Sequence, residues 1–373
     1  MKKIFNINIP VVALLVMLSF GIFSCASEPN KGAYHSLNGA RQKGIGEIDD
    51  IVVISDNSLW NTALKDTFEY YFESPYLLLP QPEAVFRLKH FSYNDIMAKP
   101  LRKKFLTMLV LADMSDTDSP ESKMALKDLG EARIKELLSS PVAGFATAKN
   151  KWAENQLIIY LVGDSQEDLE RAIAIKFPAI AAKVRQHDQP KIHKRAFYNG
   201  TNAAAMELIK DTFGISIQIP SDFIASKVRN HELIWIRKET NKTSSSLIVS
   251  RIPYTSQKQL NPDTLKNYVN AIGKKYIASR EEGSYFAIND HDLPLIKNTV
   301  NFNGHSVIEI RGIWELENDY MGGPFIAYLV PNPNKSDELL LLLGFIYAPQ
   351  KEKKSYVEDL EEIIRTVKLD REQ

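Results

Sequence analysis

Apolar residues in the first half of the folded part follow two periods in turn. Short apolar runs, typical of buried strands, alternate with longer stretches in which apolar residues recur every three or four positions, as in helices. This alternation predicts an α/β domain over residues 49–192. The predicted strands are 51–54, 85–91, 105–111 and 156–162, and the predicted helices are about 59–72, 121–138 and 167–184, with a further one from about Asn94.

The pattern changes after a polar, basic segment, 185–195, which contains Pro190. We interpret this segment as a break in the helical pattern and place a domain boundary near residues 190–200. Neighbouring strands with few helices then predict an antiparallel sheet with packed helices over residues 197–373, so the fold class is α+β. Here the predicted strands are 214–220, 233–237, 247–252, 300–302, 306–314, 324–330 and 339–347, and the predicted helices are about 203–212, 263–278 and 352–367.

A third pattern opens the chain. Lys2 and Lys3 precede an apolar run of 13 residues, 11–23, which is broken only by Ser19 and Gly21. A membrane-spanning helix needs about 20 residues, so this run is short for a span and has the length of a signal-peptide core. No other stretch approaches 18 unbroken apolar residues.

The apolar run ends at a cysteine. Ser24 precedes Cys25, the only cysteine, and with Ile22 at the position where Leu is usual this stretch resembles the lipobox of bacterial lipoproteins. The resemblance implies that residues 1–24 are a signal peptide, cleaved before Cys25, and that the thiol and the new amine carry acyl chains. Two or three such chains hold a protein stably on a membrane. The alternatives are a secretory signal with an incidental cysteine and an uncleaved anchor.

Composition narrows the function only a little. Of 373 residues, 44% are hydrophobic and 25% are charged, as in ordinary globular domains. Without residues 1–24 the chain has 44 basic and 46 acidic residues, so we exclude nucleic acid as a partner. Since Cys25 is the only cysteine, we expect no disulfide framework and no cysteine-based metal site. The polar, glycine-punctuated residues 25–48 predict a flexible tether.

Four short stretches carry a resemblance to a known family: Asp56-Asn57-Ser58-Leu59-Trp60, Leu79-Pro80-Gln81-Pro82-Glu83, Arg311-Gly312-Ile313-Trp314 and Met321-Gly322-Gly323-Pro324-Phe325. Together they look like an uncharacterised lipoprotein family of Bacteroidetes, known only as a domain of unknown function. The resemblance implies an envelope location and supplies no catalytic residues. The second half alone, opening at residues 213–220, is similar in layout to the Mog1/PsbP-like fold.

Candidate ligand-binding residues lie in the last two of these stretches. On a strand, Arg311 and Glu315 share one face and Trp314 lies on the other. Arg311 and Trp314 could form the basic and aromatic lip of a groove, and Gly322 and Gly323 could cradle a ligand. The alternatives are an Arg–Glu ion pair, a core tryptophan and a plain turn.

Other candidate chemistry is weaker. Asp290-His291-Asp292 could form a metal corner, but no histidine has HxH or HxxxH spacing, so we expect a solvated loop, no metal and no cofactor. Common catalytic signatures such as GxSxG, HExxH and the P-loop are absent, and we assign no catalytic residue. Two basic clusters, 99–104 and 183–195, indicate solvated helix ends or, alternatively, contacts with anionic lipid or glycan.

The sequence therefore predicts a non-enzymatic lipoprotein anchored in the bacterial cell envelope. Its two domains would bind another envelope component, a protein or a glycan; the membrane and the face remain open. The alternative is a hydrolase or other enzyme of unfamiliar type, with Arg311 and carboxylates in a cleft between the halves. A third hypothesis is a structural spacer without a ligand. Convergence of Asp290, Arg311 and Glu315 in one concave site would favour the enzyme.

Overall fold

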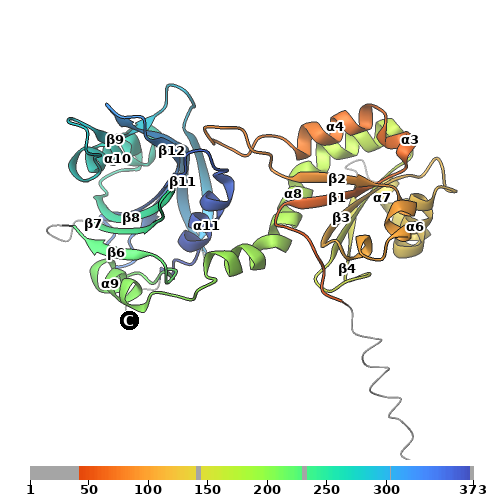
Figure 1. Ribbon diagram of the computed structural model, residues 1–373, viewed down its shortest axis with the longest axis horizontal. Coiled ribbons are helices and arrows are strands. Elements are labelled where there is room, and N and C mark those ends of the chain that lie inside the picture. Colours follow the sequence, from red (N-terminus) through yellow and green to blue (C-terminus); the bar gives the residue numbers. More distant parts are fainter. Residues whose placement is uncertain (1–41, 140–143, 229–232, 303, 370–373) are drawn as a thin grey trace, which may run out of the picture.

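A computed structural model describes residues 42–369, apart from 140–143, 229–232 and 303, as two domains joined by one long helix (Figure 1). The predicted α+β class is confirmed, because a mostly parallel sheet with helices precedes an antiparallel sheet with helices. Cys25, the signal peptide and residues 26–41 of the predicted tether lie outside the described residues. Within the described part, no helix is both long enough and apolar enough to span a membrane.

The N-terminal domain is built on a five-stranded sheet of order β2-β1-β3-β5-β4. The first four strands in this order are parallel, and β4 pairs antiparallel with β5 at the edge. Alternate residues of the central strands are buried on opposite faces, as expected for a sheet with helices on both sides. The strands are β1 (Asp50–Ile54), β2 (Arg87–Phe91), β3 (Thr107–Asp113), β4 (Phe145–Lys149) and β5 (Leu157–Gly163).

Helices form a layer on each face of this sheet. The side of Ile51 and Val53 is covered by α4 and α8, and the side of Val52 and Ile54 by α5, α6 and α7. The helices are α3 (Asn57–Trp60), α4 (Ala63–Phe72), α5 (Tyr93–Ala98), α6 (Pro120–Leu129), α7 (Glu131–Ser139) and α8 (Gln166–Ala196), with a 3-10 turn at Arg102–Lys104.

Two predicted helices are each broken in two. The predicted helix 59–72 divides into α3 and α4 because Thr62 caps a new helix, its hydroxyl accepting from the Leu64 amide. The predicted helix 121–138 divides at Gly130, whose φ of 80° lies in a region that glycine adopts easily. Strand β4 was not predicted.

The predicted break at 185–195 is wrong. Helix α8 continues for 31 residues through Pro178 and Pro190. Each proline removes a helix hydrogen bond at a cost of about 3 kcal/mol, so packing must offset it. A buried row at four-residue spacing, Ile180, Val184, Asp188 and Ile192, supplies that packing. Two of the basic side chains in this segment contact the second domain: His193 at Glu362, and Arg195 at Glu358 and Asp359.

The C-terminal domain is an eight-stranded antiparallel sheet of order β10-β11-β12-β13-β8-β7-β6, with β9 also paired to β11. Helices α9 and α11 pack on one face and α10 packs on the other. The strands are β6 (Ile224–Lys227), β7 (Leu233–Glu239), β8 (Ser244–Pro253), β9 (Tyr285–Asn289), β10 (Ile296–Phe302), β11 (His305–Glu317), β12 (Gly322–Pro331) and β13 (Glu338–Tyr347), and the helices are α9 (Ala203–Phe213), α10 (Pro262–Tyr276) and α11 (Lys354–Arg365), with a 3-10 turn at Gln257–Leu260.

Residues 214–220 differ from the prediction, because they form no strand. They make only isolated bridges, Thr201 with Pro220 and Ser216 with Lys368. Their alternation is nevertheless real: Ile215, Ile217 and Ile219 are buried in the core beneath α11. Strands β6 and β9 were not predicted.

The end of the predicted tether is not free. The Ile45 amide donates to the Lys104 carbonyl at 2.7 Å, and the Ile45 carbonyl accepts from the Leu106 amide at 2.9 Å. A second bridge joins Lys43 to Glu154. Residues 42–48 are therefore docked on the N-terminal domain.

Candidate functional site at the domain junction

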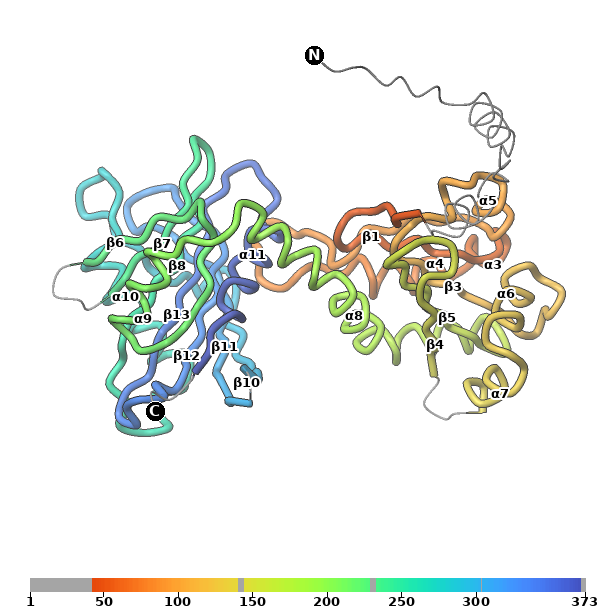
Figure 2. The backbone as a smooth tube through the Cα atoms, turned by 90° about the horizontal axis from the view of Figure 1, so that it is seen from below, coloured from red at the N-terminus to blue at the C-terminus, as the bar shows by residue number. Residues whose placement is uncertain are grey.

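Three segments meet between the domains (Figure 2): the loop of residues 73–86, the C-terminal half of α8, and α11. The loop extends from the N-terminal domain, and its Tyr76 and Leu79 are buried in the core of the C-terminal domain. Val85 packs against the cores of both domains. We call this loop of residues 73–86, which includes the proline-rich stretch 79–83, the interdomain clasp.

Helix α11 brings carboxylates into this junction. Its apolar residues, including Leu360 and Ile364, pack on the sheet. On its other side Glu358, Glu361 and Glu362 are at most 7% exposed. Buried carboxylates need charged or hydrogen-bonding partners, because losing hydration is costly.

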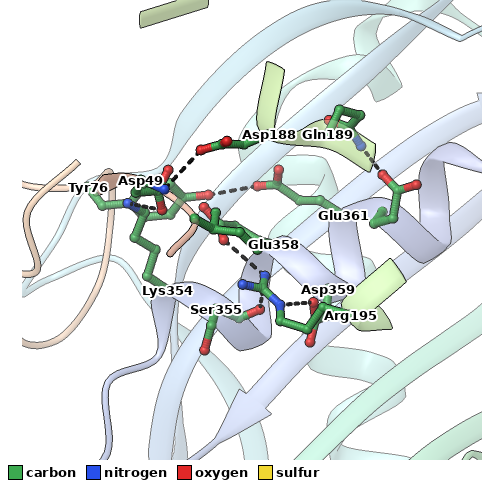
Figure 3. Close-up of polar contacts among 12 residues, drawn as sticks. Asp49, Tyr76, Asp188, Gln189, Arg195, Lys354, Ser355, Glu358, Asp359 and Glu361 are labelled. Carbon is green, nitrogen blue, oxygen red and sulfur yellow. Dashed lines mark hydrogen bonds and ion pairs between the residues drawn. The ribbon is translucent and has the colours of Figure 1, made fainter. Parts of the chain in front are cut away.

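The C-terminal half of α8 supplies several of these partners. Arg195 binds Asp359 at 2.7 Å through Nε and Glu358 at 3.0 Å through Nη2 (Figure 3). His193 Nδ1 lies 2.7 Å from one Glu362 oxygen, and Gln189 donates to the other. Part of the basic cluster 183–195 therefore pairs with the carboxylates of α11, which differs from the predicted solvated helix end.

Arg311 supplies a further partner from β11. Its guanidinium makes two bonds to Glu309, at 2.9 and 3.1 Å, and also pairs with Glu361. The Tyr76 hydroxyl donates to Glu361 at 3.0 Å and lies 3.4 Å from Arg311 Nη1. Burial alone would lower the pKa of Arg311, but Glu361 and then Glu309 raise it. Arg311 is thus permanently charged and only 12% exposed.

The clasp also caps α11. The two carboxylate oxygens of Glu83 accept hydrogen bonds from the backbone amides of Lys353 and Lys354, at 2.6 and 2.9 Å. These amides begin the helix and have no intrahelical partner, and a negative charge at a helix N-terminus is favourable. Lys354 also binds Asp49 at 2.6 Å, which joins α11 to the start of β1.

A cleft of about 730 Å³ opens beside this network. Its walls come from both domains: residues 47–49, 81–84 and Arg87 on one side, and Arg195 with 350–355 and Glu358 on the other. Both signs of charge line it.

Glu358 is the incompletely paired member of this wall. Its Oε2 accepts from Arg195, but its Oε1 has no hydrogen-bond partner among the described residues although the residue is 3% exposed. Burial, and next the charge of Asp49, raise the pKa of Glu358 to about 7. A carboxyl with such a pKa in a cleft is typical of functional sites, although structural networks also produce one.

The structure gives the other predicted site residues structural positions. Trp314 is 3% exposed, stacks on Phe286 at 4.9 Å and donates to the Ile346 carbonyl at 3.1 Å. Gly322 and Gly323 pair with β11 inside the sheet. A Cβ at Gly323 would lie 2.0 Å from the Ile346 carbonyl oxygen, so this position requires glycine for close backbone approach. Trp314 and Gly323 are buried in the sheet, and Gly322 is half-buried at the start of β12.

The three charged residues proposed to converge do not do so. Asp290 binds Lys266 at 2.6 Å, Glu315 accepts from Asn289 at 3.0 Å, and Arg311 faces Glu309 and Glu361. Among the described residues, no group of three or more His, Cys, Asp or Glu side chains is arranged to hold a metal ion.

Sequence reasoning missed Glu83, Arg195 and Glu358. A signal for them existed in the four acidic residues of 358–362, which lie on the opposite side of α11 from Leu360 and the rest of the apolar stripe, and in the basic end of α8. Opposite charges on two helices indicate a possible pairing, but only the fold shows which helices meet.

Two protein-family models match the chain, and both are described as domains of unknown function. Residues 44–197 match the family model described as "Domain of unknown function (DUF8532)", and residues 202–366 match that of "Domain of unknown function (DUF4837)". No curated protein matches the chain. The chain is similar to the solution structure of cyanobacterial PsbP (CyanoP) from Synechocystis sp. PCC 6803, with 11% identity and a TM-score of 0.29 over 42% of this chain and 87% of that one. A TM-score this low supports no argument about function.

Proposed function

We propose that the chain is a lipid-anchored protein of the bacterial cell envelope whose joined domains bind another envelope component, a protein or a glycan. The anchor would be Cys25, which directly follows the signal-like apolar run. The resemblance to a Bacteroidetes lipoprotein family supports the same location. The interdomain cleft would be the binding site.

The observation that carries the binding role is the Glu358 carboxyl, which belongs to a residue that lines a cleft of about 730 Å³ and has one oxygen without a hydrogen-bond partner among the described residues. A buried acceptor without a donor is costly, so a ligand that supplies an N–H or O–H group would gain affinity there. The charged groups around it are mostly paired with one another, and Asp290 and Glu315 do not join them. This arrangement supports a binding module over an enzyme.

Attachment is tested with Cys25→Ala. We expect the native protein in the membrane fraction, with a mass that shows loss of residues 1–24 and addition of acyl chains. The variant should leave the membrane fraction or retain its leader. A bare Cys25 in the processed native protein would refute the anchor.

Binding is tested by photocrosslinking in intact cells. A photoreactive residue at Gln81 or Glu352, both exposed in the cleft lining, should give one discrete adduct with a protein or a glycan. The same probe at Tyr320, which is fully exposed and does not line the cleft, is the control. Adduct formation should fall in Glu358→Gln. Equal labelling from Tyr320, or no discrete adduct from the cleft, would refute the proposal.

The enzyme alternative rests on Glu358, because a carboxyl with a pKa of about 7 suits acid–base catalysis at neutral pH. The Ser55–His90 pair, 2.9 Å apart, offers no accessible nucleophile: Ser55 is fully buried and Trp60 stacks on the imidazole at 4.5 Å. Turnover of chromogenic esters or glycosides that is lost in Glu358→Gln would favour the enzyme.

A further inference from the structure

A second cleft, of about 300 Å³, lies at the carboxyl ends of the parallel strands of the N-terminal domain. The chain leaves β1 for β2 on one side and returns to β3 on the other side of β1. The connections therefore diverge between β1 and β3. In open α/β sheets, ligands bind in the crevice at this kind of switch point.

Oxygen-bearing side chains dominate this cleft. Asp56 follows β1, Asp113 is the last residue of β3, and Glu121 lies in the first turn of α6. Asp116 and Gln166 add further oxygens, and the lining contains no lysine, arginine or histidine. This surplus of negative charge favours a cation and disfavours an anion.

Glu121 gives a second, independent sign of a ligand. The residue is 2% exposed, and its Oε1 accepts a hydrogen bond from the Tyr93 amide at 2.8 Å. Its Oε2 has no partner among the described residues, although the side chain forms part of the cleft wall. A buried carboxylate oxygen left in this way is costly unless something pairs with it.

The N-termini of the two nearby helices, α6 and α8, are already capped by serine side chains, so their free amides do not require a bound anion. Ser119 caps α6 by accepting from the Ser122 amide, and Ser165 caps α8 by accepting from the Asp168 amide. The aspartates are also partly engaged, since Asp113 accepts from Ser115 and Asp56 from Ser58. In Asp113 both bonds from Ser115 go to one oxygen, so the second oxygen could contact a ligand.

We propose that this cleft binds a hydrated divalent cation of the Mg²⁺ type. Carboxylate and amide oxygens are the ligands that hard cations prefer. Since no three acidic or histidine side chains in the described part are placed to hold an ion directly, the ion would keep several waters and contact one or two carboxylates, as Mg²⁺ commonly does. Six waters take roughly 180 Å³ at about 30 Å³ each, which fits the cleft.

The experiment uses the purified full chain, freed of metal with a chelator. Mn²⁺, observed by its electron paramagnetic resonance signal, should bind saturably at one site and be displaced by Mg²⁺. Glu121→Gln should weaken Mn²⁺ binding at least tenfold, and so should Asp113→Asn. Glu358→Gln, an equally buried glutamate in the other cleft, should leave binding unchanged.

Glu121→Gln keeps the shape of the side chain and the acceptor for the Tyr93 amide, so the metal-free variant should fold with an unchanged circular dichroism spectrum. If this variant does not fold, the proposal is tested with Asp113→Asn alone. This second variant should fold, because the amide oxygen of asparagine can still accept the hydrogen bonds from Ser115. Mn²⁺ binding that does not saturate, or that is equal in the native chain and the folded variants, would overturn the proposal. A negative result would not affect the proposal that the interdomain cleft is a binding site, because the two clefts share no residue.

Discussion

At the level of single residues, the junction depends on how completely each buried charge is paired. Arg311 makes charged contacts with both Glu309 and Glu361. One oxygen of Glu358 accepts a hydrogen bond from Arg195, and the other has no hydrogen-bond partner among the described residues. Breaking a fully paired buried charge is costly, whereas neutralising an incompletely paired one can be favourable. The two residues should therefore respond oppositely to substitution.

Arg311→Met should destabilise the protein by about 3–5 kcal/mol, because it leaves Glu309 and Glu361 buried without their cation. The measurement is urea unfolding at pH 7. Arg365→Met is the matched control: Arg365 also pairs with Glu361, at 3.8 Å, but is 44% exposed. A surface pair contributes at most about 1 kcal/mol. Equal losses in the two variants would contradict the assignment of Arg311.

Glu358→Gln should stabilise the protein at pH 8 and not at pH 4. The pKa of Glu358 is about 7 in the folded state, above its ordinary value of 4.5, so the folded state binds the proton more tightly. Stability from this group is therefore present at low pH and is lost as pH rises through 7. The gain at pH 8 is at most on the order of 3 kcal/mol, since one pKa unit corresponds to about 1.4 kcal/mol.

Thermal unfolding at the two pH values measures this difference. Glu352→Gln, an exposed residue of the same cleft, is the control and should show no pH-dependent change. If Glu358→Gln loses stability equally at both pH values, then Glu358 acts mainly as the ion-pair partner of Arg195.

Single-residue roles could be predicted only in part. Strand alternation correctly places Arg311 and Trp314 on opposite faces, and it is compatible with the core position of Trp314. The alternation could not show that Arg311 pairs with Glu361, which lies 50 positions away on another element. Glu358 was missed because a glutamate on a helix is usually solvated, and its burial depends on α8.

At the level of elements, errors arose where contacts between elements override local preference. Pro178 and Pro190 argue against a helix, but α8 persists because it packs against the first sheet and α11. Residues 214–220 have strand-like alternation but pack as an extended segment, since their isoleucines fill the core without a ladder. Strands with long apolar runs, such as β3 and β5, were predictable because both of their faces are buried.

The N-terminus of α11 should be sensitive to Glu83. This helix has no cap from the Lys353 side chain, and the Glu83 carboxylate takes that role from the other domain. Glu83→Gln removes the charge and one acceptor, so we expect a loss of about 1–2 kcal/mol in urea unfolding. Hydrogen exchange of the first turn of α11 should also become faster.

Glu352→Gln is the control for this helix end as well. Glu352 is exposed and directly precedes the cap residue, so its replacement should change stability by less than about 0.5 kcal/mol. Equal effects at positions 83 and 352 would show that only the local charge matters and not the hydrogen-bonded cap.

At the level of the whole molecule, helix α8 and the clasp join the domains at two places. Helix α8 runs from the first sheet to α11, and the loop of residues 73–86 extends to the second domain (Figures 1 and 2). Tyr76 and Leu79 of this loop are buried in the second core. Ordinary interdomain contacts permit relative motion unless they are large and well packed. Here the contacts include buried ion pairs and apolar side chains, so the relative position of the domains, and the cleft between them, should be fixed.

Calorimetry tests this coupling. The native protein should unfold in one transition whose calorimetric and van't Hoff enthalpies agree, because neither domain can open without exposing buried charges of the other. The double variant Glu83→Ala/Arg195→Ala removes the cap of α11 and the cation between Glu358 and Asp359. Two transitions, separated by several degrees, should then appear.

The matched control is Arg133→Ala/Glu136→Ala, which removes one acid and one arginine from an exposed pair on α7 within a single domain. This control should keep one transition, since exposed pairs contribute little. Two transitions in the native protein would show that the domains are uncoupled. The cleft would then have no fixed shape, and the charged residues in its wall would not be held in one arrangement that favours a particular ligand. A single unfolding transition of the native protein is therefore a requirement of the proposed interdomain binding site.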